Sequence, residues 1–461
     1  MLSFTPLLPR RGAHSGRLAL CAWLVCGALA LSGCSSKNVG MDEDSPIGQV
    51  KDLRVYPQNV QPYAEAIGAD TLLLDATTQA VQDARYNERF FSPWEKTKSS
   101  FSPRAFKRLI GKSWGYTGVQ AWSPDAWDAV VANINAKKFP SLAAPAITVR
   151  DTNLREAPTF TPRYSRSTPN PAIDPFDNMQ YSLLPVGMPL FVTHASRDGQ
   201  WYFVENALVS GWVLAADTAL VNDTFMQRYR NGNYAAILKD NVSLTTDDGD
   251  SRAQAHIGTI LPISADLGTS LRLFIPQRDA QGYAVTRQVT LDASAAARKP
   301  LPLRAGTLAT LGNIMISQPY GWGGTNGDRD CSSTTRDLFA PFGLWLPRNS
   351  AAQAHAGQLI MVDTLPNDSK EQLLLDMGKP FISLVWFKGH VGLYLGKYKR
   401  HAAMLHNIWG VRVTHGGNGL ERHIIGRCVI SGINPGQELS NADKEQPLSS
   451  RMQGISILPK E

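Results

Sequence analysis

Cys331, His390 and His406 are the residues whose types and spacing point most directly to chemistry. Cys331 follows the glycine-rich stretch 320–324 and stands where helical patterning begins. A thiol at a helix N-terminus meets the positive end of the helix dipole, which favours the thiolate, the form of cysteine that attacks carbonyl carbons. The sequence therefore predicts that Cys331 is a nucleophile.

A thiol nucleophile needs a base, and His390 is placed to supply one. Residues 390–396 alternate as a strand, and residues 402–406 have the pattern of its partner in a hairpin centred near Tyr398. Residues equidistant from that centre face each other in antiparallel pairing, so we expect His390 opposite His406, with their Cβ atoms about 5 Å apart. His406 would then orient His390, the role that a carboxylate or an amide fills in other catalytic triads.

The remaining histidines have no spacing typical of zinc ligands, and we expect neither a metal nor another cofactor. Cys428 lies in the strand-like stretch 427–430, where a small apolar side chain fits. Because Cys331 needs a free thiolate, we expect no disulfide between the two cysteines.

The N-terminus has the pattern of a secretory signal. A cationic stretch, residues 10–17, precedes an apolar run, residues 18–31, which is too short to cross a bilayer stably. The run ends in Leu31-Ser32-Gly33-Cys34, which resembles a bacterial lipobox. The alternative is an ordinary signal peptide with an incidental cysteine.

We expect a lipoprotein. Residues 1–33 would be removed as the signal peptide, Cys34 would carry the lipid, and residues 34–49 would form a polar tether. The residue after the cysteine is Ser35 and not an acidic retention signal, which favours the outer membrane, facing the periplasm.

Composition excludes several classes of protein. A chain of 461 residues with 43% hydrophobic and 18% charged residues is globular and too long for one core. Without Arg10, Arg11 and Arg17 of the signal, the formal charge falls from +7 to +4. That charge is too weak to indicate a nucleic-acid partner, and no run of Lys and Arg supplies a phosphate-binding face. We expect a monomer.

Patterning divides the rest of the chain into four domains: a helical N-terminal clip (50–141), a first SH3-like barrel (142–222), a second SH3-like barrel (223–296) and an α+β catalytic domain with a C-terminal tail (297–461). The first barrel has a DGQWYFV turn and strand at 198–204 and a GWV strand at 211–213, a pairing that resembles bacterial SH3-like domains. The second is strand-rich but lacks that signature. The polar tail from Gly436 is expected to wrap or fray.

The motifs of the last third resemble those of the NlpC-type cell-wall cysteine peptidases. They run in the family's order: Tyr-Gly-Trp-Gly-Gly at 320–324, Asp-Cys-Ser-Ser at 330–333, Leu-Pro-Arg-Asn-Ser at 346–350, Gly-His-Val-Gly-Leu-Tyr-Leu-Gly at 389–396 and Leu-His-Asn at 405–407. With the clip and two SH3-like domains before them, the layout is similar to the multidomain γ-D-glutamyl-L-diamino acid endopeptidases. The resemblance implies a papain-like catalytic fold.

The resemblance also implies roles for single residues. Tyr320 matches the tyrosine whose hydroxyl stabilises the oxyanion beside the backbone N–H of Cys331. Asp330 and Ser350 match positions that hold the ammonium of an N-terminal L-Ala in relatives that trim free stem peptides. Pocket residues from the first SH3-like domain would be among Asp177, Tyr181 and Glu205.

The implied function is hydrolysis of the γ-D-glutamyl–L-diamino acid bond of peptidoglycan stem peptides, with meso-diaminopimelate as the expected diamino acid. Cys331 would attack the carbonyl carbon, and His390 would protonate the leaving amine. Two alternatives stay open: a catalytically silent lipoprotein that binds peptidoglycan, and an amidase or acyltransferase on the same scaffold.

Overall fold

The computed structural model describes residues 49–170, 174–249, 252–415 and 419–460. The predicted signal peptide, the lipobox with Cys34 and nearly all of the tether lie outside these ranges. Within them, no helix has the length and apolar character that crossing a membrane requires.

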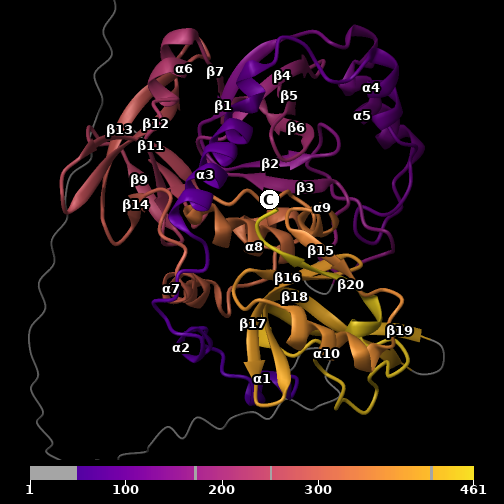
Figure 1. The fold of residues 1–461 in the computed structure, drawn as a ribbon. Helices are drawn as coiled ribbons and strands as arrows, with labels where there is room; N and C mark the ends of the chain where they lie inside the picture. Colours follow the sequence, from indigo (N-terminus) through magenta and orange to yellow (C-terminus); the bar gives the residue numbers. More distant parts are fainter. Residues whose placement is uncertain (1–48, 171–173, 250–251, 416–418, 461) are drawn as a thin grey trace, which may run out of the picture. The chain divides into compact units, whose positions relative to one another are not determined.

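The N-terminal region is helical, as the sequence predicts, but it is divided. Its helices are α1 (Asp52–Val55), α2 (Gln61–Ala66), α3 (Ala76–Phe91), α4 (Pro103–Leu109) and α5 (Pro124–Ile134). Helix α3 starts where the side chain of Asp75, its N-cap, accepts a hydrogen bond from Thr78 N. Helices α1 and α2 lie with the catalytic domain, whereas α4 and α5 lie with the first SH3-like domain (Figure 1).

The first SH3-like domain is a seven-stranded antiparallel sheet in the order β3-β2-β6-β5-β4-β1-β7. Its strands are β1 (Ala144–Thr148), β2 (Thr152–Arg155), β3 (Gln180–Leu184), β4 (Pro189–Ala195), β5 (Trp201–Glu205), β6 (Ser210–Leu214) and β7 (Thr218–Leu220). The predicted signature forms β5 and β6, which pair with Phe203 opposite Trp212. Both rings are buried, and Phe106 of α4 packs edge-on against Phe203 at 4.9 Å.

The second SH3-like domain follows α6 (Asp223–Tyr229) and has a five-stranded sheet in the order β13-β12-β11-β8-β14, with β9 and β10 paired separately. Its strands are β8 (Tyr234–Ile237), β9 (Val242–Thr245), β10 (Arg252–Ala255), β11 (Ile260–Asp266), β12 (Ser270–Arg278), β13 (Ala284–Asp292) and β14 (Ala296–Arg298). Its core is a cluster of its own, centred on residues such as Ile237, Leu261 and Leu273.

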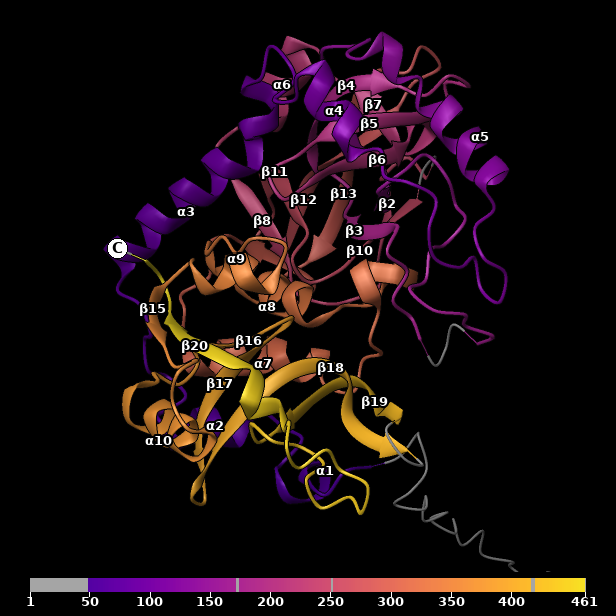
Figure 2. The same ribbon diagram turned by 90° about the vertical axis from the view of Figure 1, so that its right-hand side faces the viewer.

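The catalytic domain packs helices against a six-stranded sheet in the order β15-β20-β16-β17-β18-β19. The helices are α7 (Ala305–Met315), α8 (Cys331–Phe339), α9 (Ser350–Ala354) and α10 (Asn367–Met377). The strands are β15 (Gln358–Met361), β16 (Ser383–Phe387), β17 (His390–Tyr398), β18 (His401–His415), β19 (Gly419–Ser431) and β20 (Met452–Ile457). Figures 1 and 2 both place α8 between this sheet and strand β3 of the first SH3-like domain. The predicted α+β organisation is confirmed.

The C-terminal tail differs from its expectation. Instead of wrapping or fraying, it supplies β20, which pairs with β15 on one side and β16 on the other. Met452 and Ile455 of β20 are fully buried in one of the apolar clusters of the catalytic domain. Burial of these apolar side chains holds the tail inside the domain, which brings Arg451 toward the start of β17.

Candidate active site

Cys331 is the first residue of α8, as predicted. Asp330 caps the helix by accepting from Ser333 N at 2.8 Å, while Ser333 Oγ accepts from Asp330 N, so both orphan amides are satisfied. Cys331 is 9% exposed, and the backbone N–H of Val391 acts to lower the pKa of its thiol. Cys331 therefore lies beside the strand that His390 begins.

Two glycines let the loop before Cys331 approach the first SH3-like domain. Gly323 has φ 63° and Gly324 has φ 86°. A Cβ on Gly323 would lie 2.7 Å from the carbonyl oxygen of Gln180, and one on Gly324 would lie 2.4 Å from Cβ of Leu183. Glycine is required here by both the positive φ and the contact with β3.

His390 and His406 meet, but the predicted register is wrong. The hairpin turns tightly between Tyr398 and His401, with a bulge between Tyr394 and Gly396. The pairing of Leu393 with Leu405 puts Gly392, not His390, beside His406. A Cβ on Gly392 would lie only 3.1 Å from Cβ of His406, so the missing side chain leaves space along that face. His406 Nδ1 lies 2.8 Å from His390 Nε2.

Ser431 fixes the tautomers of both histidines. Its Oγ lies 2.7 Å from the carbonyl oxygen of Gly432, and a contact that short between two oxygens requires the hydroxyl proton between them. Ser431 Oγ must then accept from His406 Nε2–H at 2.9 Å. His406 Nδ1 is left unprotonated and accepts from His390 Nε2–H. The remaining nitrogen of His390, Nδ1, is free to take a proton.

Burial sets the charge of the pair. Burial, then the Asp330 carboxylate, raises the pKa of Cys331 to about 12, although the Val391 N–H acts in the other direction. Burial, His406 and Arg451 lower the pKa of His390 well below its usual value, and burial lowers the pKa of His406 to about 3. The sequence predicted a thiolate favoured by the helix dipole. In the structure burial acts against the thiolate, in the direction opposite to the helix dipole.

Asp330 is not a free carboxylate. Its Oδ2 lies 2.7 Å from Arg348 Nη2, and its Oδ1 accepts from Ser333 Oγ and from Ser332 Oγ. Arg348 Nε also donates to Ser182 Oγ of β3 at 2.9 Å. Although burial acts in the other direction, Arg348 and the Ser333 amide hold the pKa of Asp330 at about 2. The carboxylate is ionised and already paired.

Tyr320 lies near Cys331 and Asp330, whereas Ser350 makes no hydrogen bond with Asp330 in the described part of the chain. Tyr320 is partly buried against Phe176 and Trp409, with ring centroids 6.4 and 5.8 Å away. Burial and the nearby Cys331 and Asp330 raise the pKa of Tyr320 well above its usual value, so its hydroxyl stays a donor. Ser350 is the first residue of α9, and no hydrogen bond in the described part of the chain joins it to Asp330.

The three candidates from the first SH3-like domain differ in what they contact. Asp177 bonds Arg155 and backbone amides, and Glu205 pairs with Lys96 and bonds Ser99 and Ser100. Both carboxylates are therefore used to hold the chain together. Tyr181 is 37% exposed and interacts with Glu156.

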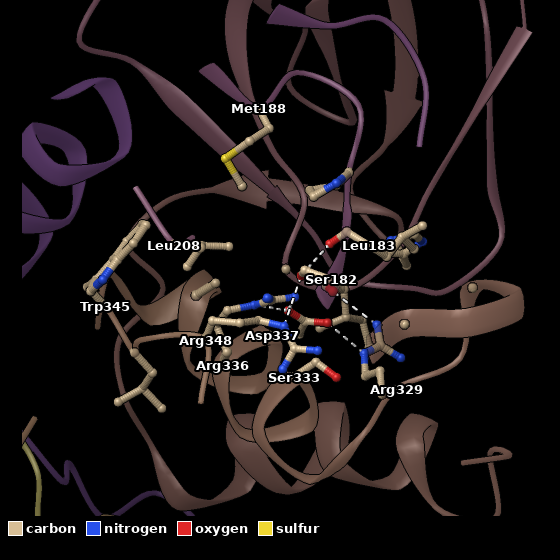
Figure 3. Close-up of a pocket in the computed structure, with 18 of the residues that line it drawn as sticks. Ser182, Leu183, Met188, Leu208, Arg329, Ser333, Arg336, Asp337, Trp345 and Arg348 are labelled. Carbon is tan, nitrogen blue, oxygen red and sulfur yellow. Dashed lines mark hydrogen bonds and ion pairs between the residues drawn. The ribbon is translucent and has the colours of Figure 1, made fainter. Parts of the chain in front are cut away.

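A cavity between α8 and the SH3-like domains is lined by residues such as Asp337 of α8 and Ser182 and Leu183 of β3 (Figure 3). Asp337 of α8 accepts from Arg329 Nε at 2.9 Å, and Arg329 Nη2 donates to Asp240 of the second SH3-like domain at 2.7 Å. Arg348 points to Ser182 in the same view. The cavity belongs to the joint between α8 and the SH3-like domains. Within the described ranges no three His, Cys, Asp or Glu side chains gather as a metal site.

Three residues of this region were not assigned a role from the sequence. Arg348 lies in the 346–350 motif, but only its distance to Asp330 shows the ion pair. Ser431 and Arg451 lie outside every motif, and no local pattern distinguishes them.

Comparison with known proteins agrees with this organisation. Four family models match: the NLPC_P60 stabilising domain, N term, at residues 23–139, the SH3 domain of SH3b1 type at 162–214, the SH3 domain of SH3b2 type at 222–266, and the NlpC/P60 family at 317–416. No curated protein matches the chain.

Two solved structures are similar. An NlpC/P60 endopeptidase from Photobacterium damselae subsp. piscicida is 23% identical, with a TM-score of 0.77 over 88% of this chain and 98% of that one. An NlpC/P60 family protein from Bacillus cereus ATCC 10987 is 18% identical, with a TM-score of 0.47 over 68% of this chain and 99% of that one. The first likeness supports the fold.

Fold and family models together define a chain with an α+β peptidase domain of NlpC/P60 type after a helical N-terminal region and two SH3-like domains. The catalytic region matches the NlpC/P60 family at residues 317–416, and the N-terminal region matches the stabilising domain named for that family. The resemblance and the fold class predicted from the sequence are therefore confirmed.

Proposed function

We propose that this chain is a cysteine endopeptidase that hydrolyses the γ-D-glutamyl–L-diamino acid bond of peptidoglycan stem peptides, with meso-diaminopimelate as the diamino acid. The observation that carries the proposal is the hydrogen-bonded chain from the Gly432 carbonyl through Ser431 and His406 to His390. That chain leaves His390 Nδ1 as a base, and α8, which begins at Cys331, packs against β17, which begins at His390.

The proposed mechanism is acyl transfer through a thioester on Cys331. As Cys331 Sγ attacks the γ-carbonyl carbon of D-Glu, its proton passes to His390 Nδ1. The oxyanion accepts from the Cys331 N–H and from the Tyr320 hydroxyl. The His390 imidazolium then protonates the leaving amine of the diamino acid, and water hydrolyses the thioester. His406 does not touch substrate and acts by holding His390.

We further propose a preference for stem peptides with a free N-terminal L-Ala, whose ammonium would lie between Asp330 and Ser350. The ionised carboxylate beside Cys331 supports it. Because Arg348 already pairs with Asp330, we expect a weaker preference than a lone carboxylate would give.

The location is proposed from the sequence alone. The protein would act as a monomer, anchored by lipid on Cys34 in the outer membrane and facing the periplasm. Mass spectrometry of the mature N-terminal peptide checks the anchor, and an unmodified Cys34 contradicts it.

The activity is tested with the purified protein and L-Ala-γ-D-Glu-meso-diaminopimelate, following release of L-Ala-D-Glu by mass spectrometry. We expect release by the wild type and none by Cys331→Ala. No release by the wild type, or equal release by both proteins, contradicts the proposal. The N-acetylated peptide is the second substrate, and cleavage of both peptides at the same rate removes the ammonium site while the hydrolase stands.

A further inference from the structure

Three arginines gather at one side of the candidate active site. Arg412 of β18 and Arg422 of β19 face each other as a directly paired couple, and both line one pocket together with Arg451. Like charges directly opposite on neighbouring strands are destabilising. This cluster therefore costs stability unless something anionic lies between its members.

The chain supplies little of that negative charge. Arg412 lies 3.6 Å from Asp443. The guanidinium of Arg422 lies over the ring of Phe176, 5.5 Å from its centroid. The Asp174 carboxylate interacts electrostatically with Arg422, but it already forms an ion pair with Arg166 at 2.8 Å.

Arg451 donates to the backbone carbonyl of Lys388. Among the described residues, no carboxylate lies within ion-pairing distance of Arg422 or Arg451.

Arg451 lies close to His390, and Arg422 lines the same pocket as Arg451. A Cβ on Gly389, the residue before His390, would lie 3.2 Å from Arg451 Nη2. After burial and His406, the positive charges of Arg451 and Arg422 also lower the pKa of His390. Burial lowers the pKa of Arg451, and the Cys331 sulfur acts on that pKa in the other direction. A carboxylate bound by Arg451 and Arg422 would therefore sit next to the bond that is cut.

We propose that Arg451 and Arg422 form a carboxylate-binding subsite that takes a carboxylate of the stem peptide adjacent to the scissile bond. The inference rests on the proposed function and names the substrate group that this side of the site recognises. Two groups of the substrate have the required chemistry. One is the α-carboxylate of D-Glu, on the acyl side, and the other is the carboxylate of the diamino acid, on the leaving side.

Occupation of the subsite also has a consequence for the base. Arg451 disfavours the imidazolium of His390 in the free protein. A bound carboxylate cancels part of that charge, which makes His390 easier to protonate when Cys331 attacks. The substrate thus helps to prepare the base that cuts it.

The test compares three peptides in steady-state kinetics: L-Ala-γ-D-Glu-meso-diaminopimelate, the same peptide with the D-Glu α-carboxylate as its amide, and the peptide with the diamino acid carboxylates as amides. We expect Arg451→Gln and Arg422→Gln to lower kcat/KM for the unmodified peptide by roughly 10- to 100-fold. For the peptide whose amide removes the recognised carboxylate, the loss shrinks to a few-fold at most, and this identifies the carboxylate. Arg400→Gln, which removes a charge from the exposed hairpin turn, is the matched control and leaves all three values unchanged.

Equal losses on all three peptides by Arg451→Gln and Arg422→Gln overturn the subsite. Arg451→Lys guards against a folding defect, since it keeps the charge and should keep the discrimination between peptides. A binding arm uses Cys331→Ala and calorimetry with the same peptides. If the wild type cleaves none of them, the proposed function fails, and the binding arm alone then decides the subsite. In the binding arm, the subsite is supported if the unmodified peptide binds more tightly than the amide peptide and Arg451→Gln abolishes that difference. The subsite is refuted if there is no such difference.

Discussion

Replacement of Ser431 by alanine tests how the histidine pair is held. In the wild type the Ser431 hydroxyl gives its proton to Gly432 and accepts from His406 Nε2–H, so His406 keeps Nδ1 free for His390. Ser431→Ala removes the acceptor. His406 is fully buried, so its Nε2–H would then have no partner.

A buried donor without a partner costs about 1 to 3 kcal/mol. The other tautomer of His406, protonated at Nδ1, avoids that cost but donates to His390 Nε2. His390 must then carry its proton on Nδ1, where it cannot accept the proton of Cys331. A cost of this size reduces the active tautomer by roughly 5- to 150-fold. We expect kcat to fall by that factor, with KM unchanged.

Ser383→Ala is the matched control. Ser383 is a fully buried serine of the same sheet whose Oγ accepts from Lys379 N at 2.8 Å, and it has no link to either histidine. We expect both variants to lose similar stability, but only Ser431→Ala to lose kcat. Nitrogen-15 NMR of labelled histidine should show His390 and His406 protonated at Nε2. Protonation of either at Nδ1 in the wild type, or equal kcat in the two variants, refutes the reasoning.

Two further predictions concern stability. Gly392→Ala puts a Cβ 2.4 Å from Met404 Sδ and should lower the free energy of unfolding, measured in urea, by about 1 to 3 kcal/mol. Gly111 has open space around it, so Gly111→Ala should change that free energy by no more than about 0.5 kcal/mol. Equal effects of the two substitutions would contradict the close packing at Gly392. Asp330 has a pKa of about 2 in the fold against 3.8 in the unfolded chain, so its ionised form adds about 2 kcal/mol to the free energy of unfolding. This stabilisation is present above pH 4 and is lost as the pH falls toward 2. Between pH 5 and 3 the wild type should lose about 1 kcal/mol more than Asp330→Asn, and parallel losses would contradict the assignment.

The sequence predicted the Cys–His–His set because each residue lies in a motif with a recognisable local pattern. It missed the register because the pairing depends on a tight turn and a bulge between Tyr394 and Gly396 that alternation does not reveal. The error kept the histidines on one face, since a shift of two residues restores the same side of a strand. Gly392 then made the diagonal contact between them possible.

Charge compensation was harder to foresee. Asp330 looked like a free carboxylate because its partner, Arg348, is separated from it by the whole of α8 and a turn. Arg451 is brought to His390 only because β20 inserts beside β16, a pairing over many tens of residues. Such contacts are set by tertiary packing, which local periodicity does not encode.

The SH3-like domains take part in positioning the residues that precede the nucleophile. Arg329, next to Asp330, is held by Asp240 and by the carbonyl of Ile257 from the second domain. The first domain supplies Ser182 to Arg348, which in turn holds the Asp330 cap of α8. Because the second domain holds Arg329 directly and the first holds Asp330 through Arg348, we expect a change in either domain to move the thiol relative to His390. The spacing of the catalytic pair is therefore a property of all three domains together.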